Sequence, residues 1–161
     1  MNSRVGATAG RTGGRSSRRR ARELALQGLY QWLIAGQDPA AIERQVIEGH
    51  ENGAPDLTKR ADLVHYRELL HGAIDGAVGL RASFAGYLDR GIEVLSPIEH
   101  AILLIGTYEL TERLEIPYRV VINEAVELAK SFGGTDGFKY VNGVLDKVAA
   151  QVRTAEIAPR A

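Results

Sequence analysis

The run from Ser96 to Gly106 constrains the fold of this chain more than any other segment, because it predicts a buried helix. Ser96 can cap the helix, Pro97 suits the first helical position, and Glu99 stands where a capping-box acid reaches back to the cap. Residues 101–106, Ala-Ile-Leu-Leu-Ile-Gly, are apolar on every face of such a helix. A helix that is apolar all round is normally buried among others, so we expect a central helix in a helical domain.

Several helices are predicted on the N-terminal side of this segment. The first should end near Gly36, and its apolar residues recur at helical spacing: Ala25, Leu29, Trp32 and Leu33. Asp38 and Pro39 predict the N-cap and first residue of a second helix, which runs to about Glu51. A loop is expected over residues 52–58, and a glycine-interrupted pattern from Asp62 to Gly91 predicts two helices or one bent helix.

Two more helices are predicted on the C-terminal side. Pro117 should open a helix that Gly133 and Gly134 end with a positive φ, and its buried stripe is Val121, Ala125, Leu128 and Phe132. Thr135 or Asp136 then caps a last helix with the stripe Phe138, Val141, Leu145, Val148 and Val152. No run alternates as a strand does, so we predict an all-α fold of about seven helices with short connections.

The formal net charge of zero conceals two oppositely charged parts. Residues 1–22 hold seven arginines and no acidic residue, which leaves 13 basic and 20 acidic residues in the rest of the chain. Residues 1–17 have almost nothing to bury, so we expect a disordered basic tail there and a flexible C-terminal tail over 154–161. Three interpretations of the basic tail stay open: a solvated segment without a role, a nucleic-acid contact arm and an organellar transit peptide.

Nothing in the sequence points to catalysis. The chain has no cysteine, no phosphate-binding glycine motif and no nucleophile-elbow motif. Surface or packing roles are the favoured interpretation of its four histidines, which are His50, His65, His71 and His100. We therefore expect no catalytic residues, no metal and no cofactor. No run is long and apolar enough for a membrane span, and a cytoplasmic location is expected.

Basic residues next to aromatic ones are more informative. The arginine cluster, defined as Arg18, Arg19, Arg20 and Arg22, stands at the start of the first predicted helix, where its charge opposes the helix macrodipole. Arginine binds phosphate through two parallel hydrogen bonds and stacks on bases, so the cluster can straddle a phosphate backbone. Lys139 and Tyr140 pair a cation with a ring, which suits a single-stranded base and its phosphate, although a core role for Tyr140 explains it as well.

Three stretches of the chain together resemble the NusB family of transcription antitermination factors. They are RRRARELALQGLYQW over 18–32, IPYRVVINEAVELAKSFG over 116–133 and DGFKYVNGVLDK over 136–147. The middle IPYxVxINEA pattern and the final KYVNGVLD pattern are highly specific in combination. The resemblance covers residues 18–153, which we expect to form an RNA-binding helical domain, and leaves residues 1–17 outside it.

The resemblance implies two small helical subdomains in a non-enzymatic protein that binds RNA. Members of the family pair with NusE, which is also a small-subunit ribosomal protein, on the boxA element of single-stranded RNA. The pair joins the antitermination complex of RNA polymerase and supports read-through, notably on ribosomal RNA operons. The free protein is a candidate homodimer.

The resemblance also implies roles for individual residues at the matching positions. The arginine cluster would bind RNA phosphates, and Asp136, Lys139 and Tyr140 would lie near the same RNA, with Tyr140 as a candidate stacking residue. Tyr30 and Glu99 match positions in or near the NusE contact. Many relatives have serine and histidine where this chain has Gly137 and Phe138, so a polar contact by those side chains is not expected here.

Two other functions compete with RNA-binding antitermination. A NusB-like domain attached to an RNA cytosine methyltransferase needs a cofactor domain and catalytic cysteines, and this chain of 161 residues has no cysteine. A helical interaction module without RNA activity would use the same surface for a protein or for self-association. The dependence of RNA binding on salt separates that module from an RNA-binding factor.

Overall fold

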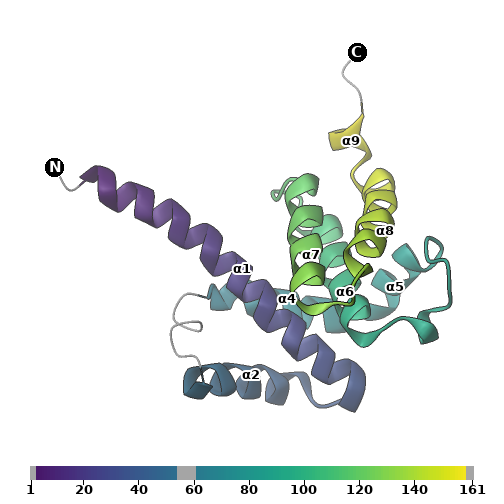
Figure 1. Cartoon of the computed structure of the whole chain (residues 1–161), viewed down its shortest axis with the longest axis horizontal. Coiled ribbons are helices and arrows are strands. Elements are labelled where there is room, and N and C mark those ends of the chain that lie inside the picture. Colours follow the sequence, from purple (N-terminus) through teal and green to yellow (C-terminus); the bar gives the residue numbers. More distant parts are fainter. Residues whose placement is uncertain (1–2, 54–60, 159–161) are drawn as a thin grey trace. The chain divides into compact units, whose positions relative to one another are not determined.

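The computed structural model describes residues 3–53 and 61–158, and over these residues the chain is helical without strands (Figure 1). Its elements are α1 (Ser3–Ala35), α2 (Pro39–Gly53), α4 (Leu63–Asp75), α5 (Ala77–Ala85), the 3-10 helix η1 (Ile92–Val94), α6 (Pro97–Glu112), α7 (Tyr118–Phe132), α8 (Gly137–Val152) and α9 (Thr154–Ile157). The predicted all-α fold is confirmed. None of the described helices has the length and apolar character that a membrane crossing requires.

The chain divides into two compact units, Met1–His71 and Gly72–Ala161, so the boundary falls inside α4. In the first unit α1 packs against α2. The residues buried in this unit include Leu24, Leu29, Ile42, Val46, Tyr66 and Leu70. Gly28 permits the close packing, because a Cβ at this position would lie 2.9 Å from Leu70 Cδ1 and 3.2 Å from Ile42 Cγ2.

Local helix signals in the first unit are confirmed by the structure. Gly36 has a φ of 64°, and its N–H donates to the carbonyl of Trp32 at 2.9 Å, as expected of a glycine that ends a helix. The carboxylate of Asp38 accepts from the N–H of Ala41 at 3.2 Å, and Asp62 accepts from the N–H of His65 at 3.0 Å. The loop expected over 52–58 lies mostly outside the described residues, and α2 ends at Gly53.

The N-terminal segment differs from the disordered tail that its composition predicts over residues 1–17. The structure continues α1 back to Ser3 without a break. The segment has no proline, and its alanines and arginines are good helix formers, so a helix anchored further along the chain can propagate through it. Part of that anchor is the N–H of Asp62, which donates to the carbonyl of Ser17 at 2.9 Å.

In the second unit α6 is the central helix, with α5, α7 and α8 packed against it (Figure 1). Ser96 Oγ accepts from the N–H of Glu99 at 3.1 Å, and the side chains over 101–105 are at most 1% exposed. Gly106 lets α8 approach closely, because a Cβ at this position would lie 2.7 Å from Leu145 Cδ1. The central buried helix predicted from the sequence is therefore confirmed.

The junction between α7 and α8 differs from its prediction. Gly133 ends α7 with a φ of −91°, which is not the left-handed conformation expected there. Glycine is needed for a steric reason, since a Cβ would lie 2.7 Å from the carbonyl oxygen of Ala129. Asp136 occupies the N-cap of α8 as expected but makes no side-chain cap hydrogen bond. Phe132, expected in the buried stripe of α7, is 49% exposed.

The C-terminal end also differs from the flexible tail expected over 154–161. Arg153 is 4% exposed, and its guanidinium donates to the carbonyls of Leu110 at 2.7 Å and Ile116 at 3.0 Å. The same guanidinium pairs with Glu156, which also accepts from the N–H of Tyr118 at 2.9 Å. These contacts hold α9 against the rest of the unit, while residues 159–161 lie outside the described part of the chain.

Candidate nucleic-acid interface

Three members of the arginine cluster face outward from α1, and one does not. Arg18 and Arg19 are exposed, and Arg20 donates to both carboxylate oxygens of Glu23 at 3.0 and 3.1 Å. Arg22 is only 3% exposed. The helical period explains this difference, because Arg22 lies on the same stripe as the buried Ala25 and Leu29. The expectation that all four arginines reach RNA therefore does not hold for Arg22.

The second predicted group, Asp136, Lys139 and Tyr140, lies at the start of α8. Lys139 Nζ is 3.8 Å from Asp136 Oδ1, and these side chains are 71% and 78% exposed. Exposed pairs at such distances contribute about 0–1 kcal/mol to stability, so Lys139 is available to another anion. This group belongs to the second unit and the arginine cluster to the first.

The ring of Tyr140 is not open in the way the sequence suggests. Tyr140 is half-buried, and the guanidinium carbon of Arg90 lies 4.8 Å from its ring centroid. Arg90 is held there by Asp89, whose Oδ1 accepts from Arg90 Nε at 2.9 Å. Burial and the neighbouring Asp89 carboxylate raise the pKa of Tyr140. The structure thus adds Arg90 to this site, and no local pattern in the sequence connects it with a ring fifty positions away.

A second ring, Phe138, stands two residues earlier on α8 and has two lysines near it. Lys130 Nζ, on the last turn of α7, is 5.3 Å from the centroid of the Phe138 ring, and Lys139 Nζ is 5.8 Å from it. Both distances lie within the roughly 6 Å over which a cation is attracted to an aromatic ring. No local pattern in the sequence identifies Lys130, because its proximity to Phe138 depends on how α7 and α8 pack.

The two residues expected at a partner contact lie in different units. Tyr30 is 38% exposed on α1. Glu99, in the first turn of α6, is beside the first turn of α8, since a Cβ at Gly137 would lie 3.0 Å from its Oε1. Glu99 is therefore close to the Asp136–Tyr140 group. A carboxylate beside the N-terminus of a helix is favourable, because the helix macrodipole is positive there.

Three histidines whose surroundings the structure describes are buried or in contact with a charged side chain. His65 and His100 are 3% and 9% exposed, and His71 Nε2 lies 2.7 Å from Glu43 Oε1. Arg81 Nε donates to His100 Nε2 at 3.0 Å. Burial, with a smaller effect of the Arg81 charge, lowers the pKa of His100 to about 4. Over the described residues, no group of three or more acidic or histidine side chains is placed to hold a metal ion.

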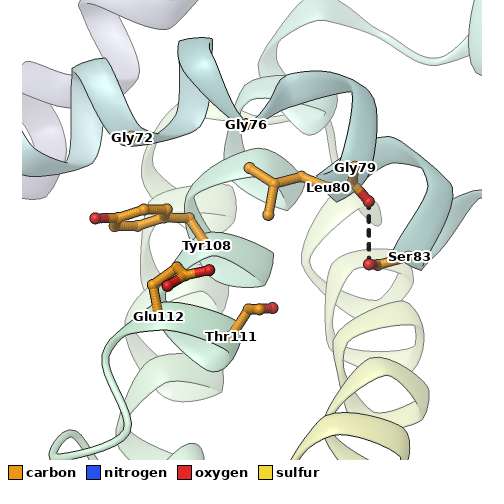
Figure 2. A pocket seen from close by; sticks show the side chains of 8 residues that line it. All are labelled: Gly72, Gly76, Gly79, Leu80, Ser83, Tyr108, Thr111 and Glu112. Atoms are coloured by element: carbon orange, nitrogen blue, oxygen red, sulfur yellow. Dashed lines mark hydrogen bonds between the residues drawn. The ribbon is translucent and has the colours of Figure 1, made fainter.

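The second unit also has a hollow of about 540 Å³ that contains none of the predicted site residues (Figure 2). Gly72, Gly76 and Gly79 line it from α4, α5 and the turn between them, and Tyr108, Thr111 and Glu112 face them from α6 (Figure 2). The ring of Tyr108 rests where a side chain at Gly72 would be, with its Cζ 2.5 Å from that Cβ position. Gly72 on α4 thus makes room for the Tyr108 ring from α6.

Comparison with known proteins places these features in a family context. Residues 19–150 match the model of the NusB family. Transcription antitermination protein NusB of Ralstonia nicotianae is 58% identical over 141 residues, which cover 88% of this chain and 87% of that protein. The protein of the same name from Bordetella pertussis is 56% identical over 162 aligned positions, which cover 99% of each.

Solved structures show the same fold. T. maritima NusB is 25% identical and has a TM-score of 0.70, with 88% of this chain and 97% of that chain covered. A chain in a crystal structure of the antitermination factors NusB and NusE with dsRNA has a TM-score of 0.70 at 24% identity, with 84% and 97% covered. Both likenesses agree with the all-helical architecture described above.

Proposed function

Because the chain belongs to the NusB family, we propose that it is a non-enzymatic, RNA-binding transcription antitermination factor. It pairs with NusE on boxA-type single-stranded RNA. The pair acts within the antitermination complex of RNA polymerase and supports read-through, notably on ribosomal RNA operons. The NusB proteins of Ralstonia nicotianae and Bordetella pertussis share more than half of their aligned residues with this chain, which is the main support for a common role.

One structural observation carries the RNA-binding part of the proposal. Arg18 and Arg19 are exposed and Arg20 is partly exposed, so three guanidinium groups lie within one turn of α1. They stand at the beginning of the segment that matches the family. Guanidinium groups bind phosphate oxygens in pairs of hydrogen bonds, which suits an RNA backbone. Arg22 is assigned a structural role because it is buried.

The partner part of the proposal depends on charge and on two side chains. Residues 23–161 hold 20 acidic and 13 basic residues, so the helical body is acidic and suits a basic ribosomal protein. Tyr30 offers a partly exposed ring and Glu99 a carboxylate, at the positions expected for the NusE contact. Neither residue needs to move out of a core to be reached.

The direct test is RNA binding by the whole chain. Labelled boxA RNA and a scrambled RNA of equal composition are titrated with the protein, alone and with purified NusE. We expect tighter binding to boxA than to the scrambled RNA, and a further gain when NusE is present. Equal binding to both RNAs with no effect of NusE would overturn the proposal. NusE binding without any RNA affinity would support the protein-interaction module instead.

A further inference from the structure

Two lysines, Lys130 on α7 and Lys139 on α8, have their ammonium groups near the ring of Phe138. We call these three residues the lysine–phenylalanine cluster. The ammonium groups are 5.3 Å and 5.8 Å from the ring centroid. The cluster brings together an aromatic ring and two positive charges, which are the two elements that single-stranded nucleic-acid sites combine.

The charges of this cluster are accessible. The side chain of Lys130 is 50% exposed and that of Lys139 is 71% exposed. Each lysine has an acidic neighbour, Glu127 or Asp136, at 3.8 Å. This distance is near the outer limit of an ion pair, and exposed pairs of this kind contribute little to stability. A phosphate can therefore draw either lysine away from its acidic neighbour and from the ring.

Tyr140 is a poorer stacking surface than Phe138. The planar guanidinium of Arg90 is 4.8 Å from the Tyr140 ring centroid, and Asp89 fixes it there through a 2.9 Å hydrogen bond. The two lysines near Phe138 have flexible, exposed side chains without such a short hydrogen bond to an acid. A base can thus reach the Phe138 ring when the lysines move to phosphates, whereas the Arg90 guanidinium, which donates to Asp89 at 2.9 Å, lies against the Tyr140 ring.

We propose that the lysine–phenylalanine cluster binds one nucleotide of single-stranded RNA, with the base stacked on Phe138 and the lysines at the flanking phosphates. The inference rests on the proposed function, because the nucleotide belongs to the same RNA. A phenyl ring has no hydrogen-bonding group, so the stacking tolerates any base. The cluster therefore adds affinity to boxA and scrambled RNA alike and adds no sequence preference.

The test uses the full chain and RNAs that carry 2-aminopurine at one position at a time. Phe138→Leu should weaken binding to both RNAs by about fivefold or more, because loss of one stacked base is worth at least about that factor. It should also abolish the fluorescence change that parent protein causes at one 2-aminopurine position. Phe138→Trp keeps a stacking ring and should preserve the affinity.

Two lysine variants distinguish a direct lysine–phosphate contact from non-specific attraction between RNA and positive charge. Lys130→Gln should weaken binding and reduce the slope of log affinity against log salt by about 0.7, the value of one phosphate contact on single strands. Lys147→Gln is the matched control, because Lys147 is also exposed, on α8, and lies outside the cluster. It should leave the slope unchanged. If Phe138→Leu fails to fold, the result for Lys130→Gln decides whether the cluster binds a nucleotide.

The outcomes distinguish this inference from the proposed function. If the parent chain binds RNA but Phe138→Leu and Lys130→Gln bind as it does, the cluster is no nucleotide site and the proposed function stands. An equal loss in Lys130→Gln and Lys147→Gln shows only general charge attraction and also overturns the inference. Absence of RNA binding by the parent chain overturns both.

Discussion

The guanidinium carbon of Arg90 lies 4.8 Å from the centre of the Tyr140 ring, and Asp89 fixes the arginine in this place. The ring belongs to a motif whose resemblance to the NusB family suggests base stacking. In this chain its neighbour is already a cation from the segment between α5 and η1. The Tyr140 ring therefore already has a cation against it, and the proposed stacking site is Phe138.

Replacing Tyr140 by leucine tests this division of roles. Tyr140→Leu should reduce RNA affinity by less than about twofold, while Phe138→Leu reduces it by about fivefold or more, since only an open ring provides stacking energy. Fluorescence anisotropy with one RNA compares the two variants, and thermal unfolding checks that both are folded. A larger loss for Tyr140→Leu would show that Arg90 moves aside and that Tyr140 stacks on the RNA.

Arg22 should act on stability, in contrast to its neighbours in the arginine cluster. It is 3% exposed and has an interaction partner, so Arg22→Ala removes a buried, partnered side chain and should lower the free energy of unfolding by about 1–3 kcal/mol. Arg19→Ala, on the exposed side of α1, should change it by less than about 0.5 kcal/mol. Urea unfolding measures both values. Similar stabilities for the two variants would show that the burial of Arg22 is unimportant.

Two helical glycines, Gly106 on α6 and Gly143 on α8, should respond to alanine in opposite ways. At Gly106 a Cβ would lie 2.7 Å from Leu145, which is fully buried, so Gly106→Ala should destabilise the protein by about 1–3 kcal/mol through overpacking. At Gly143 nothing lies within 4 Å, so Gly143→Ala should stabilise it by about 0.5–1 kcal/mol through helix propensity. Thermal or urea unfolding reports both signs, and stabilisation by Gly106→Ala would contradict the described packing.

His100 should make stability depend on pH. Its pKa is lowered from 6.5 to about 4 in the folded protein, so between these values the unfolded chain binds the proton more strongly. The contribution of neutral His100 to the free energy of unfolding is complete above pH 6.5 and is lost as the pH falls toward about 4. The total change is of the order of 1–3 kcal/mol. Urea unfolding across this range measures it. His100→Gln keeps an acceptor for Arg81 and should remove this part of the pH dependence, and an unchanged profile would refute the assignment.

The sequence predicts most of the fold because its helix boundaries depend on local signals. Ser96, Asp38 and Gly36 end or begin helices through hydrogen bonds within their own turn, and such bonds follow from nearby residues. The burial of Arg22 was within reach of the same reasoning, because it shares a helical stripe with Ala25 and Leu29. The composition of residues 3–17 predicts disorder, whereas the structure continues α1 through this segment despite its lack of apolar residues.

The site depends more on contacts between distant segments. Arg90 meets Tyr140, and Lys130 meets Phe138, only because the second unit packs the segment after α5 and the end of α7 against the start of α8. Neither contact leaves a spacing pattern in the sequence. The family resemblance supplies Lys139 and Tyr140 as candidates but says nothing about which ring is covered in this particular chain.

The exposed arginines of α1 should hold RNA phosphates, and the salt dependence of boxA binding to Arg19→Ala/Arg20→Ala measures this contact. We expect weaker binding and a log–log slope smaller by about 1.4, from about 0.7 for each of two lost phosphate contacts, with unchanged thermal unfolding. Arg44→Ala, at an exposed position on α2, serves as the control and should leave the slope unchanged. Parent-like affinity and slope in the double variant would show that these arginines do not bind RNA phosphates.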